Sequence, residues 1–236
     1  MNQAFIFDVF GTLVDWRTGV AEQVKYAFTK REIVVDPFRF ADHWRSLYGP
    51  AMDEVRSGTR EYVPLDLLHR ENLDRTLSSF GLDHALDASA RDALNRAWEQ
   101  LPAWPDVHEG MLRLRPLGFL APCSNASVAL SIRLARFAGL NWDMIAGADL
   151  AQDYKPKQSV YLNSAKALGL APETVTMVAA HNDDLAAAQQ AGLRTAFIPR
   201  VREHGEGQTV DLKAEGNWDY FADDLIDLAR QVEAQT

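Results

Sequence analysis

The chain has 236 residues, of which 47% are hydrophobic and 24% are charged, which is the composition of an ordinary globular protein with a sizeable core. Its formal charge of −9 at pH 7 leaves no overall positive field, so nucleic acid and anionic membrane surfaces are not expected partners. The single cysteine, Cys123, excludes an internal disulfide, and no apolar run approaches the length that a membrane-spanning helix needs. The N-terminal residues lack a signal-peptide pattern, and we therefore expect a cytoplasmic protein.

The first 100 residues divide into one strand and a long helical region. The segment AFIFDVF, residues 4–10, is a short apolar run with one acid, and the glycine and threonine after it predict a buried strand that ends in a loop. Four later stretches carry apolar side chains at helical spacing: residues 20–33, 41–55, 64–82 and 89–101. Almost nothing in this region resembles a central strand, so we predict a mostly helical insert over residues 16–100.

Strands and helices alternate in the second half of the chain. The predicted strands are residues 119–125, 144–150, 174–180 and 195–199, and the predicted helices are residues 127–140, 157–170, 184–193 and 221–234. Such alternation is typical of a parallel sheet covered on both faces. We therefore predict an α/β fold, a doubly wound parallel sheet formed by residues 1–15 and 101–236, with the helical insert after its first strand. The polar residues 202–217 are expected to form an exposed loop.

Polar side chains gather where the predicted strands end. Asp8 closes the first strand, Ser124 and Asn125 follow the second, Lys155 lies in a loop before a helix, and the segment HNDD at residues 181–184 follows a later strand. Ligands of open parallel sheets bind outside the carboxyl ends of the strands, so these residues predict a site there. An acid in an apolar strand is costly to bury unpaired, and Lys155 is the expected countercharge that keeps Asp8 ionised as a nucleophile.

Four segments resemble, in this order, the motifs of the haloacid dehalogenase superfamily: FDVFGTLVD, SNAS, YKP, and the acidic cluster before LAAAQQAG. The motifs cover the predicted sheet domain, and the helical insert stands where that superfamily has its cap. Four motifs at suitable spacing are far more specific than any one of them. The resemblance implies that Asp8 is a covalent nucleophile, that Lys155 and Asp184 belong to the catalytic set, and that residues 16–100 form a cap domain.

The residue two places after the nucleophile separates the subfamilies. Phosphatases of the superfamily usually have a second aspartate there, which protonates the leaving alcohol, whereas this chain has Phe10. A phenyl ring delivers no proton, and a halide leaving group needs none. Phe10 therefore favours carbon–halogen cleavage, and it resembles the aromatic residue at this position of the L-2-haloacid dehalogenases, on the substrate side of the nucleophile.

The resemblance to these dehalogenases extends to the cap. Trp44 and Arg45 are similar to the tryptophan–arginine pair whose arginine receives the departing halide, and Asn125 would flank the halide beside it. A guanidinium also suits an α-carboxylate or another anion. On composition alone Arg45 is a solvated helix residue, and its place and neighbour favour the halide-binding interpretation.

The same resemblance implies roles for three hydroxyl side chains. Tyr161, six residues after Lys155, would support the carboxylate region of the nucleophile. Thr12 and Ser124 would donate hydrogen bonds to the Asp8 carboxylate or to the substrate. Each also fits a structural role: Tyr161 as a core aromatic, Thr12 as a turn residue and Ser124 as a cap at a strand end.

The segment after the strand 174–180 departs from the family pattern. His181 stands where the dehalogenases commonly have asparagine; it would orient water together with Asp184, and we count it and Asn182 among the substrate-binding residues. Asp183 stands where relatives often have an aromatic that lines the halide pocket. A carboxylate there would repel a halide unless it is turned away, so the resemblance leaves the leaving group and the substrate size open.

The fourth motif bears on metal binding. Aligned on the LAAAQQAG run, Asp184 takes the second acidic position of the phosphatase motif and Ala180 takes that of the magnesium-binding aspartate. Alanine has no ligand atom, so we expect no metal and no other cofactor. Asp183 and Asp184 are adjacent, however, and some members of the superfamily bind metal through such a pair. A magnesium-dependent phosphate or phosphonate hydrolase therefore stays open as the alternative.

Together these residues predict a two-step hydrolysis. Asp8 attacks the α-carbon of a short 2-halocarboxylate in line and expels the halide toward Arg45 and Asn125. Water then attacks the Asp8 carbonyl, with Asp184 as base and Lys155 nearby, and releases the 2-hydroxy acid. The expected partners are the small halogenated carboxylic acid and water, and the resemblance implies a homodimer. A non-enzymatic relative that binds a small acid is a further alternative, and the intact catalytic set speaks against it.

Overall fold

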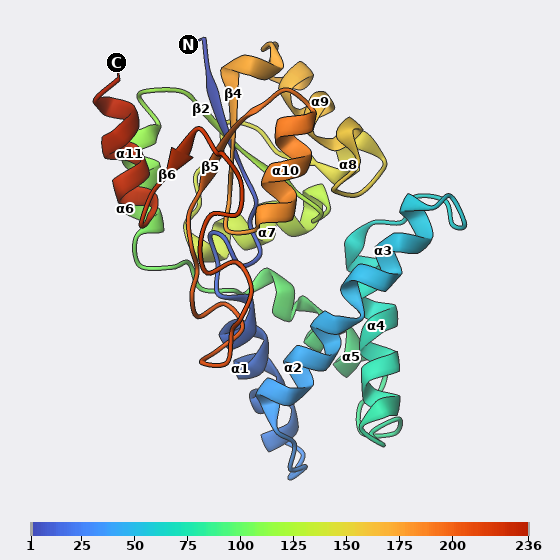
Figure 1. The fold of residues 1–236 in the computed structure, drawn as a ribbon. Coiled ribbons are helices and arrows are strands. Elements are labelled where there is room, and N and C mark those ends of the chain that lie inside the picture. Colours follow the sequence, from blue (N-terminus) through green and yellow to red (C-terminus); the bar gives the residue numbers. More distant parts are fainter. Residues whose placement is uncertain (1, 236) are drawn as a thin grey trace.

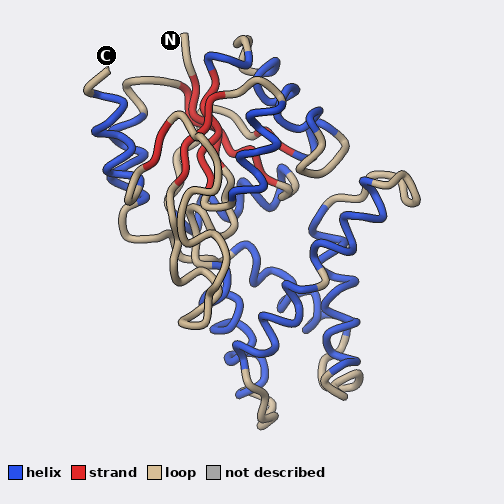
Figure 2. Tube along the Cα trace, in the orientation of Figure 1, coloured by secondary structure: helices blue, strands red, loops and turns tan. Residues whose placement is uncertain are grey.

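The computed structural model describes residues 2–235 and contains a six-stranded parallel sheet. In spatial order the strands are β3, β2, β1, β4, β5 and β6, and each neighbouring pair is parallel. Their bounds are β1 Ala4–Phe7, β2 Phe119–Ser124, β3 Ala146–Gly147, β4 Val175–Ala179, β5 Arg194–Phe197 and β6 Tyr220–Phe221. The strand order turns back at β1, and Figure 2 shows helices around the central strands. The predicted doubly wound α/β sheet is confirmed.

Helices cover both faces of the sheet because successive side chains of each strand point to opposite faces. In β1, Phe5 and Phe7 join the hydrophobic core that includes α6 (Val107–Leu114), α7 (Val128–Ala138) and α11 (Leu225–Glu233). Ala4 and Ile6 join a separate core with α9 (Gln158–Ala167) and α10 (Asn182–Gln190). Figure 1 shows α6 and α11 on one side of the sheet and α9 and α10 on the other. The fold therefore has three layers.

The chain between β1 and α6 is helical in every regular element. Its elements are α1 Trp16–Thr29, α2 Pro37–Ser46, α3 Tyr48–Arg56, α4 Leu65–Ser79, α5 Ala88–Asn95 and the short 3-10 helix η1 Arg96–Glu99. Asp15 and Asp36 accept hydrogen bonds from the first backbone amides of α1 and α2, and these caps start the two helices. The helix predicted over residues 41–55 is divided at Leu47 into α2 and α3. Figure 1 shows this segment beyond the carboxyl ends of the strands.

Several predicted elements differ from the structure. The strand predicted over residues 144–150 is wrong beyond Gly147, where the chain turns into α8 (Ala148–Ala151). Gly147 has φ 113°, and a Cβ there would lie 2.2 Å from the Ser124 carbonyl oxygen, so extended backbone ends at this residue. The helix α6 and the strand β6 were not predicted, and β6 is too short to show an alternating pattern. No helix within residues 2–235 is long and apolar enough to cross a membrane.

The register of the central strands brings the candidate site together. Phe7 pairs with Pro122 of β2 on one side and with Val178 of β4 on the other. Asp8 follows, and its backbone amide donates to the Val178 carbonyl at 3.0 Å. The carboxyl ends of β2, β1 and β4 are therefore level, and the residues that follow these strands meet at one edge of the sheet.

Candidate active site

Asp8 is a buried carboxylate held by three side chains, with only 7% of the residue exposed. Its Oδ1 accepts a hydrogen bond from Lys155 Nζ at 2.8 Å, and its Oδ2 accepts one from Thr12 Oγ1 at 2.7 Å. His181 Nδ1 lies 3.2 Å from the same Oδ2. Burial alone would raise the pKa of Asp8, but Lys155 and His181 outweigh it and hold that pKa far below its usual range. Asp8 is therefore ionised at neutral pH, as a carboxylate nucleophile must be.

Lys155 joins two carboxylates. Its Nζ also donates to Asp184 Oδ2 at 2.5 Å, and Asp184 Oδ1 accepts from the Tyr161 hydroxyl at 2.6 Å. Burial disfavours the ammonium, yet Asp184 and Asp8 together raise the pKa of Lys155 above its ordinary value. Burial raises the pKa of Asp184 against the pull of Lys155. Both oxygens of Asp184 are thus engaged, and Tyr161 contacts this acid instead of the Asp8 carboxylate near which the sequence places it.

The loop after β2 positions the lysine. Asn125 Oδ1 accepts from the backbone amide of Lys155 at 2.8 Å, while Arg56 of α3 donates to the Lys155 carbonyl oxygen at 2.5 Å. Ser124 Oγ accepts from the backbone amide of Ala126 at 3.1 Å, and among the described residues no hydrogen bond joins Ser124 to Asp8. Asn125 therefore fixes the backbone that carries the ammonium, and Ser124 shapes the turn beside it.

These residues surround a cavity of about 560 Å³ between the sheet edge and the helical segment. The sheet edge contributes Asp8 and Phe10, and the helical segment contributes Arg45, Tyr48 and Met52. The further lining residues that the sequence singles out are Asn125, Lys155, Tyr161, His181, Asn182, Asp183 and Asp184. A cavity of this size, with aromatic and charged side chains together in its wall, suits a small polar ligand.

Arg45 reaches the cavity from α2. Its guanidinium carbon lies 3.9 Å from the ring centroid of Tyr48 and 5.4 Å from that of Trp16, so aromatic faces hold it in place. Its Nη1 is buried and has no hydrogen-bond partner in the described part of the chain. A buried guanidinium N–H is costly to leave unpaired, so an anion that binds beside Arg45 would be stabilised by it. Trp44, in contrast, donates through Nε1 to the His69 carbonyl at 2.9 Å and packs α2 against α4.

Phe10 occupies the position two residues after the nucleophile and lines the cavity with only 2% exposure. Its ring packs edge-on against Trp98 and His69, with centroid distances of 5.8 and 6.3 Å. The packing holds an aromatic wall next to Asp8, and the position offers a leaving group no proton.

Glu203 is the main site residue that the sequence does not reveal. It belongs to the segment 202–217, which is predicted to be an exposed loop, yet only 1% of Glu203 is exposed. Its Oε2 lies 2.9 Å from His181 Nε2, and its Oε1 accepts from Trp16 Nε1 at 2.9 Å. The loop prediction is wrong at this residue because the imidazole and the indole offset the cost of burying the carboxylate. The sequence carries only a weak signal for it, an acid shortly after a predicted strand.

Asn182 anchors a surface loop. Its Nδ2 donates to Asp211 Oδ1 at 2.8 Å and to the Lys213 carbonyl at 3.0 Å. Its Oδ1 accepts from the Glu215 amide at 2.8 Å and from Trp218 Nε1 at 3.1 Å. The amide is thus fully used within the protein. This contrasts with the substrate contact predicted for Asn182, although the residue does lie on the cavity wall.

The geometry at the strand ends does not fit a magnesium ion. Lys155 Nζ lies within hydrogen-bond distance of both Asp8 and Asp184, so an ammonium stands between the carboxylates that would otherwise hold a cation. Ala180 offers no ligand atom, and Asp183 Oδ1 accepts from the Asp184 amide at 2.8 Å. No group of three or more His, Cys, Asp and Glu side chains in the described part of the chain is arranged to hold a metal.

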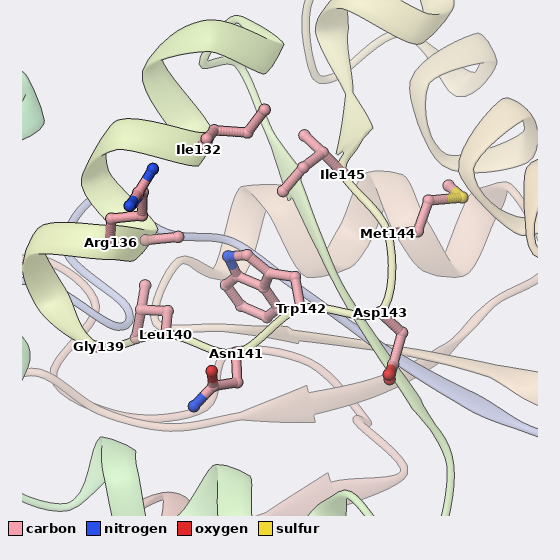
Figure 3. A pocket seen from close by; sticks show the side chains of 10 residues that line it. Ile132, Arg136, Gly139, Leu140, Asn141, Trp142, Asp143, Met144 and Ile145 are labelled. Atoms are coloured by element: carbon pink, nitrogen blue, oxygen red, sulfur yellow. The ribbon is translucent and has the colours of Figure 1, made fainter.

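A second depression, of about 490 Å³, lies between α7 and the segment that precedes β3. Figure 3 shows the Trp142 indole projecting toward the helix that carries Ile132 and Arg136. The segment 141–145 lies before β3, toward the amino ends of the strands, and none of the predicted site residues lines this depression. It is therefore separate from the cavity at Asp8.

A parallel sheet that presents an ionised aspartate and a lysine at its carboxyl edge, under a helical segment that closes a cavity, defines an α/β enzyme. The family model of haloacid dehalogenase-like hydrolases matches residues 3–192. The chain belongs to this family.

The chain is also similar to relatives with assigned activities. The chain is 30% identical over 210 residues to an (S)-2-haloacid dehalogenase of Pseudomonas sp. strain YL, covering 87% of each chain. It is 46% identical to a defluorinating L-2-haloacid dehalogenase of known structure, with a TM-score of 0.96 and coverage of 98% and 95%. A second L-2-haloacid dehalogenase structure is also 46% identical, with a TM-score of 0.92 and coverage of 98% and 100%.

Proposed function

We propose that the protein hydrolyses short (S)-2-haloalkanoic acids to 2-hydroxy acids through an ester of Asp8, without a metal. One observation carries the proposal: the ionised Asp8 carboxylate faces the same cavity as Arg45, whose buried Nη1 has no partner in the described part of the chain. Phe10 stands where a phosphatase would have its proton donor. The similarity to the L-2-haloacid dehalogenases supports the same substrate class.

In the first step a carboxylate oxygen of Asp8 attacks the α-carbon, and the carbon–halogen bond breaks with its electron pair on the halide. Arg45 supplies guanidinium N–H donors to the departing anion, and no proton is required. The attack inverts the carbon. Asn125, which also lines the cavity, lies on the wall that we expect the halide to approach.

In the second step water attacks Cγ of the Asp8 ester. Lys155 donates to Asp8 Oδ1 at 2.8 Å and Thr12 donates to Asp8 Oδ2 at 2.7 Å, so whichever oxygen remains as the carbonyl has a donor for the oxyanion that forms. The bond between Cγ and the substrate oxygen then breaks, and that oxygen takes one proton of the attacking water to give the 2-hydroxy acid. The second water proton is released as the Asp8 carboxylate re-forms. Attack at the carbonyl avoids the need for free hydroxide at the α-carbon.

Residues 16–100 act in this proposal as a cap. They contribute Arg45, Tyr48 and Met52 to the cavity wall, opposite the strand ends that carry the nucleophile. Enclosure by the cap would exclude bulk water and orient the substrate carboxylate. The homodimer and the cytoplasmic location inferred from the sequence stay predictions.

The test is a halide-release screen with EDTA present. Its substrates are the fluoro, chloro and bromo forms of haloacetate and of (S)-2-halopropionate. We expect turnover on at least one of them, abolition in Asp8→Asn, and wild-type rates in the control Asp83→Asn, which changes an exposed acid. Hydrolysis of phosphate or phosphonate esters that needs added magnesium, with no halide release, would replace the proposal with the metal-dependent alternative.

A further inference from the structure

A chain of three side chains runs from the nucleophile into the loop after β5. His181 Nδ1 lies 3.2 Å from Asp8 Oδ2, and His181 Nε2 lies 2.9 Å from Glu203 Oε2. The other oxygen of Glu203 accepts from Trp16 Nε1 at 2.9 Å. The imidazole therefore has one nitrogen on the reacting carboxylate and the other on a buried carboxylate, an arrangement that fixes the ring for proton transfer.

The loop packs tightly enough to hold Glu203 in this position. A Cβ added at Gly11 would lie 2.1 Å from Glu203 Oε1, so the Glu203 carboxylate packs directly against the backbone of Gly11, three residues after the nucleophile. His181 immediately precedes α10, at the end of β4, and its side chain retains 19% exposure toward the cavity that it lines. His181 is thus held by Glu203 through one ring nitrogen, and its ring also lines the cavity.

Asp184, the base expected from the sequence, is less well placed for this step. Its Oδ2 accepts from Lys155 Nζ at 2.5 Å and its Oδ1 accepts from Tyr161 at 2.6 Å. Because an ammonium donates to one oxygen and a phenol donates to the other, a water molecule cannot donate to Asp184 without competing with one of these two donors. Its geometry suits the holding of Lys155.

We propose that His181, oriented by Glu203, is the general base that takes the proton of the hydrolytic water; this rests on the proposed function. As the water oxygen bonds to Cγ of the Asp8 ester, one water proton passes to His181 Nδ1 and the carbonyl electron pair moves onto oxygen. The bond between Cγ and the substrate oxygen then breaks, and that oxygen takes the proton back from His181. Asp8 is left as a carboxylic acid and passes its proton to His181, which restores the imidazolium of the free enzyme. The one proton that leaves in each turnover is therefore the proton that His181 loses after the first step, together with one halide.

The charge of His181 follows the covalent state of Asp8. Burial disfavours the imidazolium, but Glu203 and Asp8 together raise the pKa of His181 well above its ordinary value, which favours the charged ring in the free enzyme. Esterification neutralises Asp8 and removes one of these two anions, so the ring is free to lose its proton to the cavity. Charged groups surround the His181–Glu203 pair. The acidic neighbours are Asp8 and Asp184, and the basic neighbours are Lys155, Arg45 and His204. Esterification of Asp8 therefore favours the neutral, basic form of His181.

Rapid-quench measurement of halide with (S)-2-chloropropionate tests this assignment. In His181→Gln, which cannot accept a proton, we expect a halide burst equal to the enzyme concentration, followed by a steady-state rate lower by roughly 100-fold or more. Intact-mass analysis should show the propionate ester on Asp8. The control His84→Gln, at an exposed histidine, should behave as wild type. In His181→Ala, added imidazole should accelerate ester hydrolysis.

Glu203→Gln separates a positioning role from a structural one. Removing this anion lowers the pKa of His181, so the acidic limb of the ester-hydrolysis rate should move to lower pH, with a maximum reduced about 10-fold. If Glu203 had only a structural role, the acidic limb of the pH profile would stay at the same pH in Glu203→Gln. The proposal is overturned if the steady-state rate of His181→Gln stays within threefold of wild type, or if this variant loses the halide burst as well as the steady-state rate. It is also overturned if the ester accumulates in Asp184→Asn and not in His181→Gln. Absence of any halide release from the wild-type enzyme would refute the proposed function itself.

Discussion

Replacing Lys155 with methionine leaves two buried carboxylates, Asp8 and Asp184, without the ammonium that lies 2.8 and 2.5 Å from them. At an effective dielectric constant of about 20, each contact corresponds to an attraction of roughly 6 kcal/mol, much of which is offset by the cost of desolvating three charges. Breaking such a buried pair lowers stability by about 3–5 kcal/mol. We therefore expect Lys155→Met to lower the free energy of unfolding at pH 7 by about 3–5 kcal/mol, measured by urea denaturation.

The pH dependence of this deficit tests its electrostatic origin. In the wild type the pKa of Asp8 is lowered, so its stabilising contribution is present above the pKa of an unfolded aspartate and is lost as the pH falls. In Lys155→Met at least one of the two carboxyls should have a raised pKa, and folding then binds a proton. The deficit should therefore shrink between about pH 7 and pH 4.5. The control Lys166→Met, at an exposed lysine, should change stability by less than about 0.5 kcal/mol. A Lys155→Met deficit below about 1 kcal/mol at pH 7, or one that does not vary with pH, would show that the ammonium does not stabilise the two carboxylates.

Three further outcomes follow from the structure. Arg45→Ala should lower kcat/KM for halo-acids roughly 10- to 100-fold and Arg45→Lys should not restore it, because the lysine lacks the planar fork; unchanged kinetics in both would remove the cap arginine from the mechanism. Exhaustive chelation should leave halide release unchanged, and a loss recovered by magnesium would contradict the metal-free site. Asp106 accepts hydrogen bonds from both Arg200 Nη atoms at 2.7 and 2.8 Å, so Asp106→Asn should lower the free energy of unfolding by about 3 kcal/mol in urea denaturation. The pKa of Asp106 is lowered, so this difference from the wild type should narrow as acid protonates the wild-type carboxylate.

The fold was largely predictable because its signals are local. The alternation of apolar strands with amphipathic helices after Pro102, and helical spacing before it, predict the parallel sheet and the helical segment. The strands that were predicted wrongly or not at all differ from the prediction for physical reasons. The strand β3 ends at Gly147 because a close approach to Ser124 turns the chain, and β6 is a two-residue edge strand with no period to detect.

The site was predictable where residues belong to motifs and not where they come from loops. Asp8, Lys155 and Asp184 each follow a recognisable strand or motif, and the structure places them in contact. Glu203 could not be found in this way because its burial depends on contacts with residues 22 and 187 positions away in the sequence, His181 and Trp16. Long-range contacts of this kind leave no local pattern.

The formation of an Asp8 ester and its hydrolysis at the carbonyl carbon are tested most directly by a single turnover in water enriched in oxygen-18. Enzyme in excess over (S)-2-chloropropionate passes through one cycle, and the lactate and the Asp8 peptide are then analysed by mass spectrometry. Attack on the carbonyl places the new oxygen in Asp8 and leaves the first lactate unlabelled, because its hydroxyl oxygen comes from the aspartate. Labelled lactate and an unlabelled Asp8 peptide would show that water attacks the α-carbon directly, and the covalent mechanism would be wrong.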